Sequence, residues 1–174
     1  MAHYTQHSFN LNVNPPLPKG TQVAVGTSAV SLQRFGFNMP IEISTASAFR
    51  QGANPAQLKT ITVMAHFDTG ASRTSIDDGL AQHLGLIPTG VGTIRTAAGP
   101  KTMNNYAVDV AFLNTQLHGL LNLQVGACDL GFDLAKNQAN PNDITNFGVL
   151  IGRDIMSLWH ITWHGPTSTV MISD

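Results

Sequence analysis

Apolar and polar positions alternate along much of this chain. Every second residue from Ile61 to Phe67 is apolar, and the same alternation runs from Tyr106 to Phe112. Because successive side chains of a strand point to opposite faces of a sheet, this spacing predicts strands with one buried face. Sparse charge and abundant Thr, Val, Gly and Asn point the same way. We therefore predict an all-β fold.

The predicted strands follow one another at short intervals. We expect them at residues 21–25, 29–32, 37–43, 59–67, 91–96, 101–113, 120–125, 147–151, 159–163 and 168–173. Residues 91–113 are expected to form one long hairpin, and residues 159–173 a closing hairpin. Pro40 lacks a backbone N–H, which suggests an edge position for its strand.

Helices are expected to be few and short. The segment that begins at Ser75 has the form of a helix N-cap, and its helix ends at Gly85. A second short helix is predicted at residues 154–158. Residues 44–58 and 129–145 are rich in small and polar residues and are expected to be loops.

The length of 174 residues is enough for one domain with its own core. We place that domain at residues 37–174 and treat residues 1–36 as an N-terminal extension of unclear role. Residues 1–14 are a loose tail or an edge strand. The proline-rich residues 15–18 are interpreted as a linker rather than a recognition motif.

Composition excludes several classes of function. The formal net charge is −1 with no basic cluster, so neither nucleic acid nor an anionic membrane is an expected partner. No membrane-length apolar run or signal peptide is visible, and we expect a soluble, cytoplasmic protein. The single Cys128 excludes an intrachain disulfide and is interpreted as an apolar filler. His160 and His164 lie about 13 Å apart on a strand, too far for one zinc ion, and we predict no metal and no cofactor.

Candidate chemistry lies where the strand at residues 59–67 ends in Asp68-Thr69-Gly70. A carboxylate acts as a general base when it is fixed and within reach of a water molecule. Gly70 allows another backbone to approach closely, and the hydroxyl of Thr69 can hydrogen-bond across a neighbouring turn. A chance turn remains an alternative for this tripeptide alone, because Asp, Thr and Gly are ordinary turn residues.

A second motif follows near the C-terminus, where a short apolar strand leads into Gly152-Arg153-Asp154. Together, FDTGAS at residues 67–72 and LIGRDIM at residues 150–156 resemble the retropepsin-like aspartic proteases, the retroviral proteases and their cellular relatives. The resemblance covers roughly residue 37 to the C-terminus. It implies a single-domain acid protease fold, a closed β-barrel or sandwich with a flap hairpin and one or two short helices.

The resemblance implies an aspartic endopeptidase that acts on a peptide or protein substrate. Since the chain holds one Asp-Thr-Gly, the pair of Asp68 carboxylates must come from the two subunits of a homodimer. The residues that the resemblance assigns to catalysis are Asp68, Thr69 and Gly70. Those that it assigns to substrate binding are Ala71 and Ser72 after the turn, and Ala97, Ala98 and Gly99 at the flap tip.

Two features leave alternatives open. In retroviral proteases the matching Arg pairs with an Asp one place after Asp-Thr-Gly-Ala, but that place here is Ser72, so Arg153 needs another partner, such as Asp77, Asp78 or a carbonyl. A catalytically weak or inactive retropepsin-like module for dimerisation or peptide binding is the alternative function, and an unrelated β-sandwich is a third. The closing hairpin is expected either at a dimer interface or in its own subunit's core.

Overall fold

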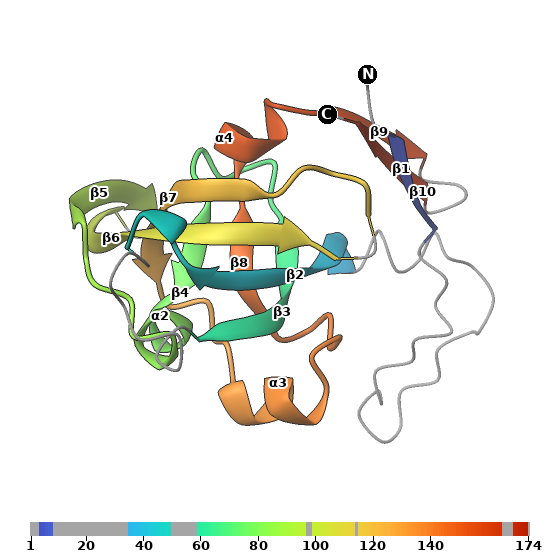
Figure 1. Ribbon diagram of the computed structural model, residues 1–174. Helices are drawn as coiled ribbons and strands as arrows, with labels where there is room; N and C mark the ends of the chain where they lie inside the picture. Colours follow the sequence, from blue (N-terminus) through green and yellow to red (C-terminus); the bar gives the residue numbers. More distant parts are fainter. Residues whose placement is uncertain are drawn as a thin grey trace, which may run out of the picture.

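The computed structural model describes residues 4–8, 35–49, 59–96, 99–113, 115–164 and 169–173 (Figure 1). The strands predicted at residues 21–25 and 29–32 and the proline-rich residues 15–18 lie outside this part of the chain. Strands dominate the described residues, and the helices are short. The all-β prediction is therefore confirmed.

Most strands form one sheet that closes on itself. Its order is β2-β3-β8-β4-β7-β6-β5, and an additional β2–β6 pairing turns the first six into a barrel. The strands are β2 (Phe37–Thr45), β3 (Thr60–Phe67), β4 (Ser75–Asp77), β5 (Gly90–Thr96), β6 (Gly99–Phe112), β7 (Leu120–Cys128) and β8 (Phe147–Ile151). Strands β5 and β6 pair antiparallel, which confirms the long hairpin.

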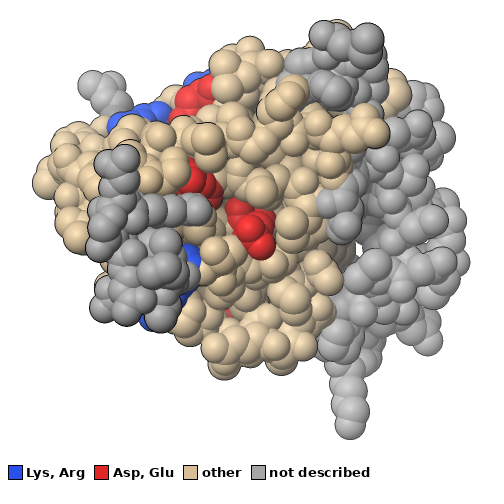
Figure 2. Space-filling model, viewed as in Figure 1, with Lys and Arg blue, Asp and Glu red and all other residues tan. Residues whose placement is uncertain are grey.

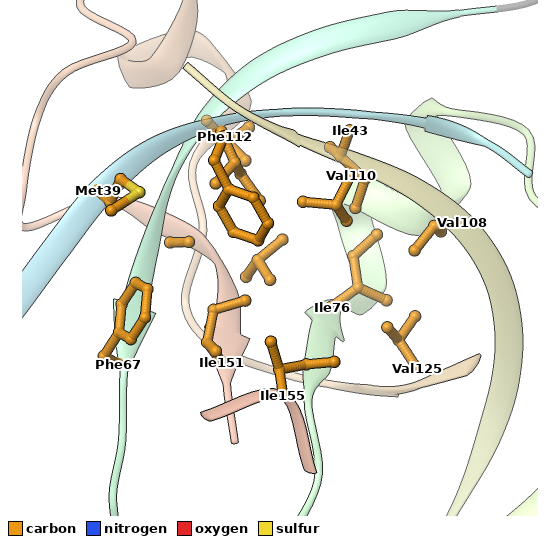
Figure 3. Close-up of a cluster of buried hydrophobic side chains, with 14 of the residues drawn as sticks. Met39, Ile43, Phe67, Ile76, Val108, Val110, Phe112, Val125, Ile151 and Ile155 are labelled. Atoms are coloured by element: carbon orange, nitrogen blue, oxygen red, sulfur yellow. The ribbon is translucent and has the colours of Figure 1, made fainter. Parts of the chain in front are cut away.

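The barrel interior is filled by the apolar face that the alternation predicted. Figure 3 shows side chains from all six barrel strands converging there: Met39, Ile43, Phe67, Ile76, Val108, Val110, Phe112, Val125 and Ile151, together with Ile155. Burying a side chain of this size contributes roughly 1.5–3 kcal/mol. The core therefore fixes the register of the strands, since a one-residue slip would turn each apolar face outward.

Pro40 does not mark an edge strand, contrary to the sequence prediction. Strand β2 pairs with β3 on one side and with β6 on the other. The β6 ladder begins only at Ile41, and the Leu113 N–H donates to the Pro40 carbonyl at 3.3 Å beyond it. The proline thus lies where the ladder ends, and its missing N–H costs little there.

The short elements differ most from their predictions. Residues Ser75–Asp77 form the short strand β4, which the sequence did not predict, and the helix that follows is α2 (Asp78–His83). Asp77 is its N-cap and accepts hydrogen bonds from the next backbone amides. Residues 129–145 were predicted as a loop but contain α3 (Leu134–Ala139), which is capped by Asp133.

Two further short helical elements complete the barrel domain. The predicted C-terminal helix is α4 (Arg153–Met156), and a 3₁₀ turn, η1, covers Ser47–Phe49. In Figure 1, α4 lies above the barrel and α3 below it, at opposite ends. The end that carries α4 is the one at which β8 ends.

A small second sheet stands beside the barrel (Figure 1). Its order is β1-β10-β9, with β1 at Tyr4–Ser8, β9 at His160–His164 and β10 at Thr169–Ser173. The closing hairpin is thus confirmed, and residues 4–8 of the N-terminal segment form an edge strand.

The apolar face of the closing hairpin packs within its own chain. Val170 and Ile172 are almost completely buried in the core, and Trp159 and Ile161 are partly buried against it. The Trp159 ring contacts the Phe112 ring edge-on, with centroids 5.0 Å apart. These four residues therefore pack into their own subunit, and a role of the hairpin at a dimer interface stays a prediction.

The surface carries little charge. Figure 2 shows a mostly uncharged face with small, separate groups of acidic and basic side chains. Among the described residues, no helix is long and apolar enough to cross a membrane.

Candidate active site

The Asp68 turn begins at the residue after β3. The Asp68 carboxylate accepts the Gly70 N–H at 2.7 Å, and the Asp68 carbonyl accepts the Ala71 N–H at 3.1 Å. Asp68 is half-buried, whereas Thr69, Gly70 and Ser72 are exposed. The turn therefore holds one carboxylate in a fixed direction and leaves it open to water.

The two sequence motifs meet because β3 and β8 are parallel neighbours. Phe67 lies beside Ile151, so both strands end at the same edge of the sheet. The Asp68 N–H continues the ladder by donating to the Ile151 carbonyl at 3.0 Å. Residues 68–72 and 152–154, which are about a domain apart in sequence, consequently share one end of the barrel.

Gly152 sits directly against the backbone of the Asp68 loop. A Cβ at this position would lie 2.5 Å from the Arg73 carbonyl carbon and 2.6 Å from its oxygen. The next residue continues the contact, since the Arg153 N–H donates to the Ala71 carbonyl at 3.0 Å. Only glycine allows the two loops to approach this closely.

A polar network links Thr74 and Asp154 beneath the turn. The Thr74 hydroxyl donates to Asp154 Oδ1 at 2.8 Å, and the Thr74 N–H donates to Asp154 Oδ2 at 2.9 Å. The same hydroxyl accepts the Gly152 N–H at 3.1 Å. Thr74 is completely buried, so its bond with the Gly152 N–H is shielded from water, whereas its two bonds to the half-buried Asp154 are partly shielded.

Arg153 finds its partner in the turn itself. Its Nη1 donates to the Thr69 carbonyl at 2.7 Å and to the Gly70 carbonyl at 3.1 Å. Of the partners that the sequence left open, a carbonyl is the one observed. Asp77 is occupied elsewhere, because its carboxylate caps α2 and accepts the Leu130 N–H at 2.9 Å.

His66, two residues before Asp68 on β3, contacts Asn38 and Phe147. Asn38 Nδ2 donates to the Phe35 carbonyl, so Asn38 Oδ1 faces the ring and His66 Nδ1 is the donor at 3.0 Å. The imidazole stacks on Phe147, with centroids 5.0 Å apart. Burial lowers the pKa of His66 below its usual 6.5, although the nearby Asp68 carboxylate acts to raise it.

The predicted substrate-binding residues divide into two groups. Ala71 and Ser72 follow the Asp68 turn and belong to the same loop as Asp68. Gly99 opens β6 at the tip of the β5–β6 hairpin, with a φ of 113° that favours glycine. Ala97 and Ala98 lie outside the described residues, and the flap role of this hairpin stays a prediction.

Two carboxylates lie at this end of the barrel: Asp154 is held by Thr74, and Asp68 is oriented by the Gly70 N–H and left open to water. Within the described part of the chain, no group of three or more His, Cys, Asp or Glu side chains is placed to hold a metal ion. Asp68 can take a proton from water, but one carboxylate cannot at once be the ionised base and the protonated acid.

Thr74 is the site residue that sequence reasoning missed. It follows Asp68 by six positions and has no motif of its own, and its partner Asp154 is 80 positions away. The signal that could have found it is the Asp154 that follows Gly152-Arg153, because a carboxylate at a sheet edge needs donors from the neighbouring loop.

Comparison with known proteins adds a family and two distant structures. The family model described as aspartyl protease matches residues 55–154. A crystal structure of a retropepsin-like aspartic protease from Rickettsia conorii is similar at 17% identity and a TM-score of 0.41, covering 79% of this chain and 93% of that one. The solution structure of a simian foamy virus protease has 18% identity and a TM-score of 0.38, covering 70% and 94%. No curated protein sequence matches significantly.

Proposed function

This chain belongs to the aspartyl protease family, and we propose that it is an endopeptidase in which Asp68 activates the water that attacks the peptide bond. The observation that carries the proposal is the Asp68 turn. Its carboxylate is oriented by the Gly70 N–H and remains open to solvent. Thr69 and Gly70 complete the catalytic turn in this proposal.

Peptide hydrolysis by this chemistry needs two carboxylates in different protonation states. Two like charges at close range cannot both ionise, so a facing pair shares one proton. The ionised member takes a proton from water, while the protonated member polarises the scissile carbonyl. A shared-proton pair works between its two macroscopic ionisations, so we expect acidic to mildly acidic activity that no longer rises above about pH 8.

We assign the second carboxylate to Asp68 of a second copy of the chain. The sequence has one Asp-Thr-Gly, so the two-fold axis of a homodimer is the simplest way to bring two such turns together. In this arrangement Ala71 and Ser72 offer backbone groups to an extended peptide. Ala97, Ala98 and Gly99 close over it from the hairpin tip.

The substitution Asp68→Asn tests the proposal. An amide is nearly the same shape as a carboxylate but cannot accept the proton, so we expect hydrolysis of a peptide library to fall by roughly 10²–10⁴-fold. Circular dichroism should show an unchanged fold. The matched control is Glu42→Gln, because Glu42 is exposed on the barrel strand β2, and its turnover should equal that of the wild type.

Two outcomes contradict the assignment. Wild-type turnover by folded Asp68→Asn protein would exclude Asp68 as the catalytic base. If the wild-type chain binds peptides without hydrolysing them at any pH, the function is that of a peptide-binding module instead.

A further inference from the structure

The Arg153 guanidinium has donors left over beside the catalytic turn. Both printed bonds of this side chain come from Nη1, which binds the Thr69 and Gly70 carbonyls. Among the described residues, none accepts a hydrogen bond from Nη2 or Nε, and none pairs a carboxylate with Arg153. The side chain is exposed. A guanidinium in this state presents a planar edge that fits a carboxylate with two parallel hydrogen bonds.

The two acidic side chains of these loops bond to donors other than Arg153. Asp154 accepts the hydroxyl and the amide of Thr74, and Asp68 accepts the Gly70 N–H. Ser72, an exposed residue of the same loop, carries no charge. The positive charge of Arg153 is therefore not balanced by a carboxylate within its own loop.

We propose that Arg153 binds a carboxylate of the substrate and gives this enzyme a preference for acidic peptides. The inference rests on the proposed function for the location of the peptide, which passes Ala71 and Ser72. Arg153 holds the backbone of the same turn, so a carboxylate on its free edge belongs to a residue close to the scissile bond. The carboxylate can be a Glu or Asp side chain or the C-terminus of a short peptide.

The expected preference is modest because the guanidinium is exposed. Ion pairs in water contribute little, and we expect about threefold to fivefold in affinity or in kcat/KM for Glu over Gln at the position that reaches Arg153. Added salt should weaken the preference. It should also vanish as the pH falls through about 4, where a Glu side chain becomes protonated.

The experiment separates binding from catalysis. Fluorescein-labelled degenerate octapeptide pools, each with Glu or Gln fixed at one position, are titrated against the Asp68→Asn chain by anisotropy. The same pools are then hydrolysed by the wild type. A second arm compares free C-terminal acids with C-terminal amides, which distinguishes a side-chain carboxylate from a terminal one.

The variant Ser72→Asp supplies a competing carboxylate, and Ser72→Asn is its uncharged control of the same shape. We expect the Glu-to-Gln ratio to fall to about one in Ser72→Asp and to persist in Ser72→Asn, each ratio being taken within one variant. Arg153→Gln should remove the ratio as well, whereas Arg153→Lys should keep part of it.

The outcomes are distinct. A preference in binding without any hydrolysis upholds the inference and overturns the proposed protease activity. Hydrolysis with a Glu-to-Gln ratio of about one at every position, and with equal rates for free C-terminal acids and C-terminal amides, overturns the inference and leaves the proposed protease activity intact. A ratio that is the same in Ser72→Asp and Ser72→Asn also overturns it, and a chain that neither binds nor cleaves any pool overturns both.

Discussion

Replacing Gly152 with alanine tests how closely the two loops of the candidate site must pack. The added Cβ would lie 2.5 Å from the Arg73 carbonyl carbon, where ordinary contact begins at 3.4 Å. The two backbones must therefore separate by about 0.9 Å, because the obstructing atoms belong to the main chain and cannot rotate away. The φ of Gly152, −92°, is one that alanine adopts freely, so any loss comes from crowding alone.

The magnitude follows from what this contact supports. Overpacking of this kind costs about 1–3 kcal/mol of unfolding free energy. Separation of the loops also stretches the Arg153–Ala71 and Gly152–Thr74 hydrogen bonds, which hold the turn that carries Asp68. A misplacement near 1 Å can lower a rate by roughly 10²-fold. We therefore expect kcat/KM to fall by roughly 10- to 100-fold.

Urea unfolding and peptide hydrolysis measure the two effects on the same preparations. Gly90→Ala is the matched control, since a Cβ on Gly90 meets nothing within 4 Å, and it should leave both quantities near their wild-type values. If folded Gly152→Ala protein had the stability and kcat/KM of Gly90→Ala, close packing of the loops would not be what positions Asp68.

Two further predictions concern groups that support the site. Thr74→Val removes the hydroxyl that joins Asp154 to the Gly152 N–H, so urea unfolding should show an unfolding free energy lower by about 1–3 kcal/mol. Thr74→Ser keeps the hydroxyl and should restore most of that free energy. Equal stability of the two variants would contradict this prediction. Burial lowers the pKa of His66 in the folded chain below 6.5. At a pH between these two values the unfolded chain binds more protons than the folded chain, so the unfolding free energy falls as the pH drops through this window. His66→Phe keeps an aromatic ring but loses the Asn38 hydrogen bond and the titratable group. Between pH 7 and pH 5 its unfolding free energy should therefore change less than that of the wild type. An equal change in both proteins would show that His66 is not the source of this pH dependence.

Much of the barrel could be predicted because its strands carry an alternating pattern. The strand predicted at residues 147–151 is β8 as observed, and the segment at 59–67 is β3 with one residue fewer. In β3 the apolar residues alternate, whereas β8 is a continuous run of apolar residues and glycine, and burial of these apolar side chains stabilises both strands. The hydrophobic pattern and the structure thus share one physical cause.

The short elements could not be predicted in the same way. Strand β4 has three residues, too few to show a period, and Ser75 and Asp77 also suit a helix cap. Helix α3 has six residues and buries little, so its N-cap at Asp133 had no apolar periodicity to support it. Pairing with β7 and β8 decides the structure at β4, and such long-range contacts leave no local signal.

The sequence predicted the motif residues of the candidate site but not the hydrogen bonds that hold them in place. Asp68 and Gly152 stand out in the sequence because glycine and acidic residues follow apolar strands. The partner of Arg153 could not be assigned, since any carbonyl within reach is chemically equivalent. Only the fold places the Thr69 and Gly70 carbonyls at its Nη1.

In the proposed dimer, each active site needs one Asp68 from each of the two chains. Wild-type chain is mixed with Asp68→Asn chain in different proportions at a constant total concentration. That concentration is kept above the range in which dilution lowers specific activity, and each mixture is equilibrated before peptide hydrolysis is measured. Random pairing makes the fraction of fully wild-type dimers fall as the square of the wild-type fraction, so an equal mixture should retain about one quarter of the activity. Retention of about one half, with activity linear in the wild-type fraction, would mean that a single chain holds a complete site and would contradict the account.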